Sequence, residues 1–279
     1  MARRYSCREF LDRLRAEIAR GRPLVMTGAG SGICAKFIER GGVDILGVYN
    51  TGYFRMQGYG SLAGMLPIAD SNELVFQLAR REVLPQVRET PVVLGVNGVD
   101  PLRDMRLYLE DCRQLGISGA HNFPTVAWFD GEFRRTLEAT GLGYQHEIDM
   151  LNIARELDLL TVGYAFNLED TERLMLGAGP DIFIFHCGIT GGGSTGDAGA
   201  LSLEATAARS RGPFEIARKI KPDVLLLAHG AAIVEPADAQ FVLDRTDCHG
   251  VQLGSSIERL AIEGPLERRA AAFKVLRFP

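Results

Sequence analysis

The 279-residue chain lacks the patterns that mark several large classes of protein. Its five cysteines are Cys7, Cys34, Cys112, Cys187 and Cys248; they are widely spaced and include no C-x-x-C pair, which argues against a disulfide framework and a zinc ribbon. No apolar run approaches the ~20 residues of a membrane-spanning helix. With 31 Lys and Arg against 35 Asp and Glu, no basic excess favours nucleic acid or a membrane surface. We therefore expect a cytoplasmic protein with reduced thiols and a small-molecule ligand.

What the chain does have is a regular alternation of short apolar runs and helical segments. The strand-like runs are Leu24–Thr27, Asp44–Tyr49, Val92–Asn97, Ile117–His121, Leu160–Ala165, Asp181–His186, Val224–His229 and Gly250–Gly254. A helix at Ser6–Arg20, which begins with the capping box of Ser6 and Glu9, precedes them. A barrel of this kind commonly needs ~250 residues. The order predicts an α/β fold, a (β/α)8 TIM barrel with an extra N-terminal helix, as one domain over residues 1–279.

In such barrels the catalytic groups lie at the C-terminal ends of the strands. Three of the five histidines, His121, His186 and His229, end predicted strands, and Asn50 and Asn97 lie at the ends of two others. We expect Asn50, Asn97 and His121 to act as hydrogen-bond donors and His229 as a base or nucleophile, with His186 helping to orient the substrate. The alternative for each single histidine is a hydrogen-bonded structural role.

Glycine-rich loops follow several of the same strands, and glycine lets backbone N–H groups approach an anion closely. The richest is F-H-C-G-I-T-G-G-G-S-T-G at 185–196, and Gly254 and Ser255 open a helix after the eighth strand. The residues predicted to bind a phosphate-like group are Gly28, Gly30, Ser31, Gly188, Gly191, Gly192, Gly193, Gly230, Gly254 and Ser255. The alternative is a flexible lid without a ligand.

Five motifs together resemble a known family. They are T-G-A-G-S-G at 27–32, V-Y-N-T-G at 48–52, G-M-L-P-I-A-D-S-N-E at 64–73, F-H-C-G-I-T-G-G-G at 185–193 and G-V-Q-L-G-S-S-I-E-R at 250–259. They resemble the phosphoenolpyruvate hydrolase-like TIM barrels, within the phosphoenolpyruvate mutase and isocitrate lyase superfamily. The resemblance implies a hydrolase or lyase that cleaves a C–P or C–C bond in a 2-oxo acid with a phosphonate, phosphate or carboxylate group. The alternative is a non-catalytic barrel that binds a nucleotide, an acidic metabolite or a protein.

The resemblance also implies a role for Asp70, which begins a D-S-N-E element that in relatives places an aspartate near the reacting atom. Asp70 with Glu73 is equally a helix capping box. The superfamily's Mg²⁺ ligands, carboxylates after strands three and four, are replaced here by Asn97 and His121-Asn122. Three alternatives stay open: Asp70, Asp100 and Glu235 around a divalent metal, the three histidines around Zn²⁺, or neutral donors in place of a metal.

The last predicted element is an apolar stripe in the tail Pro265–Pro279. Leu266, Ala270, Phe273 and Leu276 lie near helical spacing. Similar superfamily barrels exchange this region between subunits, so we expect a homo-oligomer.

Overall fold

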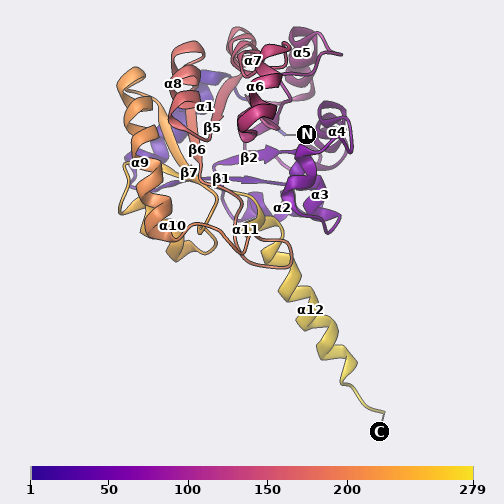
Figure 1. Cartoon of the computed structure of the whole chain (residues 1–279). Helices are drawn as coiled ribbons and strands as arrows, with labels where there is room; N and C mark the ends of the chain where they lie inside the picture. The colour runs from indigo at the N-terminus through magenta and orange to yellow at the C-terminus, as the bar shows by residue number, and fades with distance from the viewer. Residues whose placement is uncertain (1, 279) are drawn as a thin grey trace.

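The computed structural model describes residues 2–278 and shows a closed barrel of eight parallel strands in chain order (Figure 1). The barrel closes where β1 pairs with β8, with Met26 opposite Gln252. The strands are β1 Leu24–Gly28, β2 Ile45–Val48, β3 Val92–Gly95, β4 Gly119–His121, β5 Leu160–Ala165, β6 Ile182–His186, β7 Leu225–His229 and β8 Gly250–Leu253. The predicted TIM barrel is confirmed, and each strand lies inside or within one residue of its predicted range.

Helices surround the barrel in the predicted alternation. They are α1 Cys7–Ala19, α2 Gly32–Arg40, α3 Asn50–Met56, α4 Ser71–Leu78, α5 Met105–Leu115, α6 Gly131–Ala139, α7 Gln145–Glu156, α8 Leu168–Gly177, α9 Leu203–Ile220, α10 Pro236–Leu243, α11 Ser255–Glu258 and α12 Leu260–Lys274. Two short 3-10 turns, η1 Ser61–Met65 and η3 Val126–Trp128, and one π-helical turn, η2 Ala79–Val83, complete the elements. Helices α3 and α6 had no counterpart in the sequence analysis.

The extra helix α1 closes the N-terminal end of the barrel. Ser6 and Glu9 form the predicted capping box, and Phe10 and Leu14 are fully buried against side chains that fill the barrel interior. On the same side, Arg4 pairs with Asp158 just before β5 and Arg15 with Asp223 just before β7. The opposite end, where the strands terminate, is therefore the end left for a ligand.

Tyr49, directly after β2, occupies the upper interior of the barrel. A Cβ on Gly47 would lie 2.3 Å from the Tyr49 ring, and one on Gly95 would lie 2.6 Å from it. Glycine at these two strand positions therefore makes room for the buried ring.

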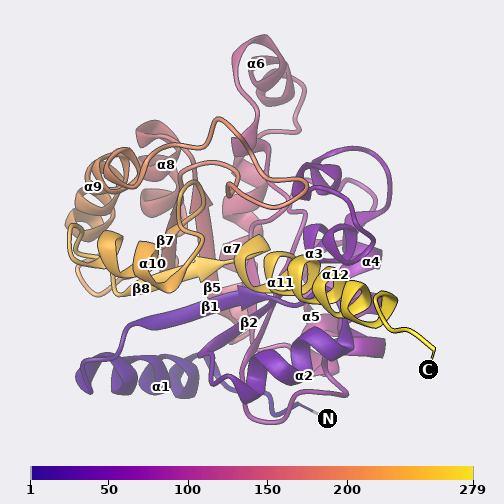
Figure 2. The same ribbon diagram turned by 90° about the horizontal axis from the view of Figure 1, so that it is seen from below.

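Helix α12 leaves the barrel and projects from it in both views (Figures 1 and 2). No residue of α12 is buried, and Leu266 and Phe273 are 65% and 61% exposed. Among residues 2–278, no helix has the length and apolarity that spanning a membrane requires.

Candidate active site

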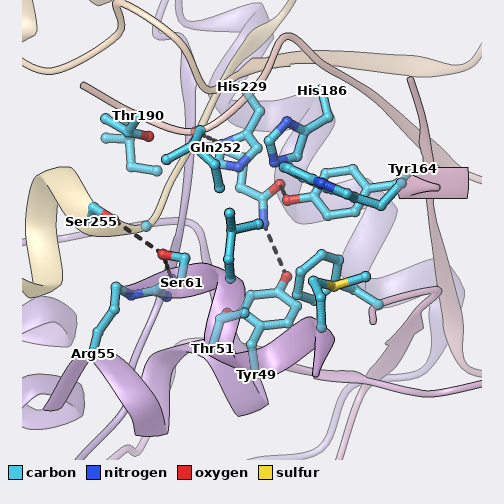
Figure 3. Close-up of a pocket in the computed structure, with 17 residues that line it drawn as sticks. Tyr49, Thr51, Arg55, Ser61, Tyr164, His186, Thr190, His229, Gln252 and Ser255 are labelled. Carbon is cyan, nitrogen blue, oxygen red and sulfur yellow. Dashed lines mark hydrogen bonds between the residues drawn. The ribbon is translucent and has the colours of Figure 1, made fainter. Parts of the chain in front are cut away.

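A cavity lies at the C-terminal ends of the strands (Figure 3). Arg55, Ser61 and Ser255 lie on one side of it, and Tyr164 and His186 lie on the opposite side. His229 and Gln252 lie between these two groups. Further apolar side chains complete the lining: Leu62 and Met65 from η1, Phe123 and Trp128 from the β4 loop, and Ile189 from the β6 loop. The cavity therefore has a polar, cationic end and an aromatic end.

The two histidines at the cavity have their protons fixed by the backbone. The Gly188 N–H donates to Nδ1 of His186 at 3.1 Å, so His186 carries its own proton on Nε2. His229 Nδ1 lies 2.7 Å from the Gln252 carbonyl oxygen, which can only accept, so His229 keeps a lone pair on Nε2. The rings are perpendicular, with centroids 4.3 Å apart. The cavity therefore presents one imidazole as a hydrogen-bond donor beside another as a base.

Both imidazoles are held neutral. Burial lowers the pKa of His229 to about 4, because the hydrogen bond to Gln252 opposes this effect only in part and the charge of Arg55 adds to it. Burial lowers the pKa of His186 well below its ordinary value, and the neighbouring histidines and Arg209 act in the same direction. At neutral pH the base is therefore free to accept a proton.

A chain of hydrogen bonds runs beneath the cavity and includes the third predicted histidine. The Tyr164 hydroxyl donates to Oε1 of Gln252, whose Nε2 donates to the Tyr49 oxygen at 3.1 Å. The Tyr49 oxygen also lies within hydrogen-bonding distance, 2.8 Å, of Nδ1 of His121. His121 is fully buried and does not line the cavity. It contacts the cavity indirectly, by holding the Tyr49 hydroxyl.

Arg55 supplies the positive charge at the polar end. Its Nε donates to Glu258 Oε2 at 2.7 Å, Nη2 donates to the same oxygen, and Nη1 donates to Ser61 at 2.9 Å. A guanidinium has five N–H donors, so two remain for a ligand. Arg55 and Glu258 side chains are 6% and 0% exposed. Within residues 2–278, Arg55 is the only lysine or arginine that lines the cavity, and no carboxylate lines it.

The structure places Asp70 outside the cavity. It is the N-cap of α4, where it accepts from the Glu73 N–H at 3.0 Å, and it pairs with Arg103 at 2.8 Å. Burial opposes ionisation of Asp70, but the bonds from Arg103 and from the Glu73 backbone outweigh it and lower the pKa of the carboxyl. Both carboxylate oxygens are therefore bound by the protein, away from the cavity.

Asn50 and Asn97, the two asparagines predicted to act as hydrogen-bond donors in catalysis, are hydrogen-bonded to other residues of the protein. Asn50 is buried, donates to the Gly64 carbonyl at 2.7 Å and accepts from the Thr51 N–H at 2.8 Å. Asn97 is bound through its backbone to the Asn72 side chain at 2.9 and 3.1 Å. Neither lines the cavity. Of the predicted catalytic residues, the structure brings His186 and His229 together there.

Of the loops predicted to bind an anion, some residues line the cavity and others do not. Gly254 and Ser255 line the cavity, and a Cβ on Gly254 would lie 3.5 Å from Arg55 Nη2. The centre of the β6 loop turns toward α12 instead: Arg259 donates to the Gly192 carbonyl at 2.9 Å, and the Ser194 hydroxyl to Glu263 at 2.6 Å. Gly191 and Gly193 lie in the same loop, while Gly188 bonds to His186 and, through its carbonyl, to the β7 loop.

The remaining predicted glycines shape the loops rather than the cavity wall. Gly230 has φ +88°, and a Cβ there would lie 2.2 Å from the Gly188 carbonyl oxygen, so the β6 and β7 loops need this glycine to pack together. Gly28 lies beside Glu258, and Gly30 packs against the Gly52 backbone. Ser31 caps α2.

The donors present do not fit the expected metals. Asp70 and Asp100 are both bound by Arg103, and Glu235 begins α10 in a capping box with Asp238. Throughout residues 2–278, no three His, Cys, Asp or Glu side chains form a group that could hold a metal ion.

The residues missed from the sequence are those that make the cavity polar or aromatic. They are Arg55, Trp128 and Gln252. Tyr49 and Tyr164 stand at strand ends that the sequence places at the mouth of the barrel, but the sequence assigned them no role. Arg55 could not have been found, because it depends on α3, a short helix inside a segment that reads as a loop.

Comparison with known proteins gives the same fold and a family. The model of the family described as phosphoenolpyruvate hydrolase-like matches residues 9–276. The chain belongs to the phosphoenolpyruvate hydrolase-like family. Two tomato (Solanum lycopersicum) proteins, the ToMV susceptible protein tm-1(GCR26) and the ToMV resistance protein Tm-1(GCR237), are each 44% identical to this family member over 95% of its chain. The chain spans 35% of the length of these tomato proteins.

Solved structures of other proteins have the same fold as this family member. A phosphonopyruvate hydrolase in complex with oxalate and Mg²⁺ has a TM-score of 0.61 at 16% identity, covering 95% of this chain and 87% of that one. An oxaloacetate acetylhydrolase has a TM-score of 0.61 at 15% identity, covering 96% of this chain and 89% of that one. At these identities the likeness shows a shared barrel fold.

Proposed function

We propose that this barrel is a hydrolase or lyase that cleaves a C–C or C–P bond beside the carbonyl of a small 2-oxo acid. The observation that carries the proposal is the pair of neutral histidines with opposite proton placement, next to an arginine with unused donors. The names of the family and of structures with the same fold, which include a phosphonopyruvate hydrolase and an oxaloacetate acetylhydrolase, support it.

Each group has a role in such a reaction. Arg55 binds the substrate carboxylate through its two free N–H groups. His229 Nε2 accepts a proton from the attacking water, and the His186 Nε2–H donates a hydrogen bond to the oxygen on which negative charge develops. Gln252 and Tyr49 fix the floor of the cavity beneath them. A substrate bound this way reacts without a charged base in the cavity.

The experiment is a turnover screen with matched histidine variants. Phosphonopyruvate, phosphoenolpyruvate and oxaloacetate are incubated with the protein, with and without Mg²⁺ or Zn²⁺, and their consumption is followed by NMR. His229→Asn retains a donor for the Gln252 carbonyl but removes the base, and His186→Asn retains an acceptor for the Gly188 N–H but removes the donor. We expect consumption of at least one acid and a loss of about 10²-fold in kcat/KM in each variant. Equal rates in wild type and both variants would exclude these roles.

The alternative is a binding barrel without turnover. The tomato relatives favour it, because their names denote susceptibility and resistance to ToMV and no reaction. It predicts that a nucleotide, an acidic metabolite or a protein binds with measurable heat while every acid in the screen stays intact.

A further inference from the structure

The cavity is charge-balanced before any ligand enters. Arg55 is already paired with Glu258, and within residues 2–278 no second lysine or arginine lines the cavity. His186 is buried and His229 is half-buried, and both lend no positive charge because they are neutral. Each anionic group on a ligand beyond the first would therefore be desolvated without a cation to pair with it, which is costly.

The end of the cavity away from Arg55 is aromatic. The Trp128 ring lies 4.7 Å from the His186 ring and 4.7 Å from the Phe166 ring, between centroids. Phe123 also lines the cavity, and its ring centroid lies 5.6 Å from that of Tyr164. Such a surface gains free energy by covering an apolar or planar group, and it carries no cation to pair with a second anionic group.

The turn that carries Trp128 is anchored from below. The Val126 N–H donates to Glu147 Oε1 at 2.7 Å, and Asn122 Nδ2 donates to Glu147 Oε2 at 2.7 Å. Glu147 is fully buried. The 3-10 turn η3 is thus fixed to the barrel by an internal carboxyl group, and Trp128 is held against the cavity rather than on a free loop.

We infer that the substrate has a single carboxylate, bound at Arg55, and an uncharged acyl tail that packs against Trp128. This rests on the proposed function and selects a 2,4-dioxo acid, R–CO–CH₂–CO–COO⁻, as the substrate class. The bond that breaks is the C–C bond between the methylene and the acyl carbonyl, not a C–P bond.

The step balances with water alone. Water loses a proton to His229 Nε2 and its oxygen forms a bond to the acyl carbonyl carbon, while the His186 Nε2–H stabilises the carbonyl oxygen. The C–C bond then breaks, its electron pair stays with the methylene carbon, and that carbon takes the proton from His229. The products are R–COO⁻, pyruvate and one released proton.

The test uses two acids of nearly the same shape. Oxaloacetate and 2,4-dioxopentanoate differ at the tail, where a carboxylate in the first is an acetyl group in the second. We expect the dissociation constant of 2,4-dioxopentanoate to be at least ~10-fold lower than that of oxaloacetate, since an unpaired buried charge is costly. With a longer apolar tail, Trp128→Ala should reduce kcat/KM by ~10-fold or more, and Trp128→Phe should restore most of it. Phe133→Ala, an exposed aromatic outside the cavity, is the control and should change neither value.

A preference for oxaloacetate or phosphonopyruvate, or an equal loss for all acids in Trp128→Ala, would overturn the inference. Binding measurements test the inference independently of the proposed function. If no acid is consumed, the proposed function fails, and calorimetric dissociation constants of the same two acids decide the inference. Tighter binding of 2,4-dioxopentanoate supports the single-anion cavity, and tighter binding of oxaloacetate refutes it.

Discussion

Arg55 and Glu258 form a buried ion pair that joins α3, after strand β2, to α11, after strand β8. The pair joins two segments that are far apart in the sequence, one on each side of the barrel's closure. It also neutralises part of the positive charge of Arg55 that faces a ligand. Glu258 Oε1 is buried and has no hydrogen-bond partner among residues 2–278. The carboxylate therefore depends on Arg55 for most of its compensation.

Removing one member of this pair should destabilise the fold more than removing both. Arg55→Met leaves a buried, unpaired carboxylate, and we expect the free energy of unfolding to fall by about 3–5 kcal/mol. The double variant Arg55→Met with Glu258→Leu should lie closer to the wild type, because no uncompensated charge remains. Urea unfolding of the single and double variants measures this coupling. Strictly additive effects would show that the pair is not coupled.

Stability should depend on the pH through the buried histidines. Because the pKa of His229 is lowered from 6.5 to about 4 in the folded state, the unfolded chain binds a proton first as the pH falls. The contribution is complete above pH 6.5 and is lost between pH 6.5 and about 4; for His229 it amounts to at most about 3 kcal/mol. His186 and His121 act in the same direction. Unfolding measured from pH 7.5 to 4.5 should show this loss, and His229→Asn should make it smaller.

The same pKa value sets the pH profile of turnover. If His229 is the base, kcat/KM should stay level as the pH falls through 6.5 and should decline only toward pH 4, where the folded protein protonates it. An acidic limb centred near 6.5 would mean that another group is the base.

Asp70 gives a direct contrast between sequence and structure. If Asp70 is the base or nucleophile, Asp70→Asn should lower turnover by ~10². Its position as an N-cap paired with Arg103 predicts instead that the variant keeps turnover within about 2-fold, since asparagine caps nearly as well. The control Asp70→Ala removes the cap and should cost about 1 kcal/mol of stability. Turnover and urea unfolding of both variants decide between the two predictions.

Gly254 offers a test of the anion position. In Gly254→Asp the new Cβ would lie 3.5 Å from Arg55 Nη2, and the carboxylate that it carries would compete for the free donors of Arg55, so affinity for the acid should fall by ~10-fold or more. Gly254→Asn has the same size without the charge and should cost less. Gly192→Val, in the part of the β6 loop that faces α12, should leave affinity unchanged, although its φ of +79° makes the variant less stable. Calorimetry with 2,4-dioxopentanoate measures the affinity of all three variants. Equal losses of affinity in Gly254→Asp and Gly254→Asn would mean that the new side chain acts by steric block and not by its charge.

The sequence was enough to predict the barrel because each strand and helix is marked locally. Apolar runs, the Ser6 capping box and the order of elements all depend on neighbours in the chain. The cavity depends on contacts between distant segments. Arg55 acquires its place from Glu258, 203 residues later, and the β6 loop turns toward α12 because Arg259 and Glu263 bind it there. The proton positions of His186 and His229 follow from backbone bonds that strand endings alone do not specify.

Helix α12 carries the last prediction. Leu266 and Phe273 on α12 and Leu276, which follows it, are each more than 60% exposed where the chain leaves the barrel, and covering such side chains is favourable in water. We therefore expect the protein to self-associate at micromolar concentration. Replacing Phe273 and Leu276 by glutamate should shift sedimentation toward the monomer, whereas Arg268→Glu with Arg269→Glu, a charge change on the same helix, should not. A wild-type chain that sediments as a monomer would show that these side chains stay uncovered in solution, and α12 would then need a different partner to explain its apolar residues.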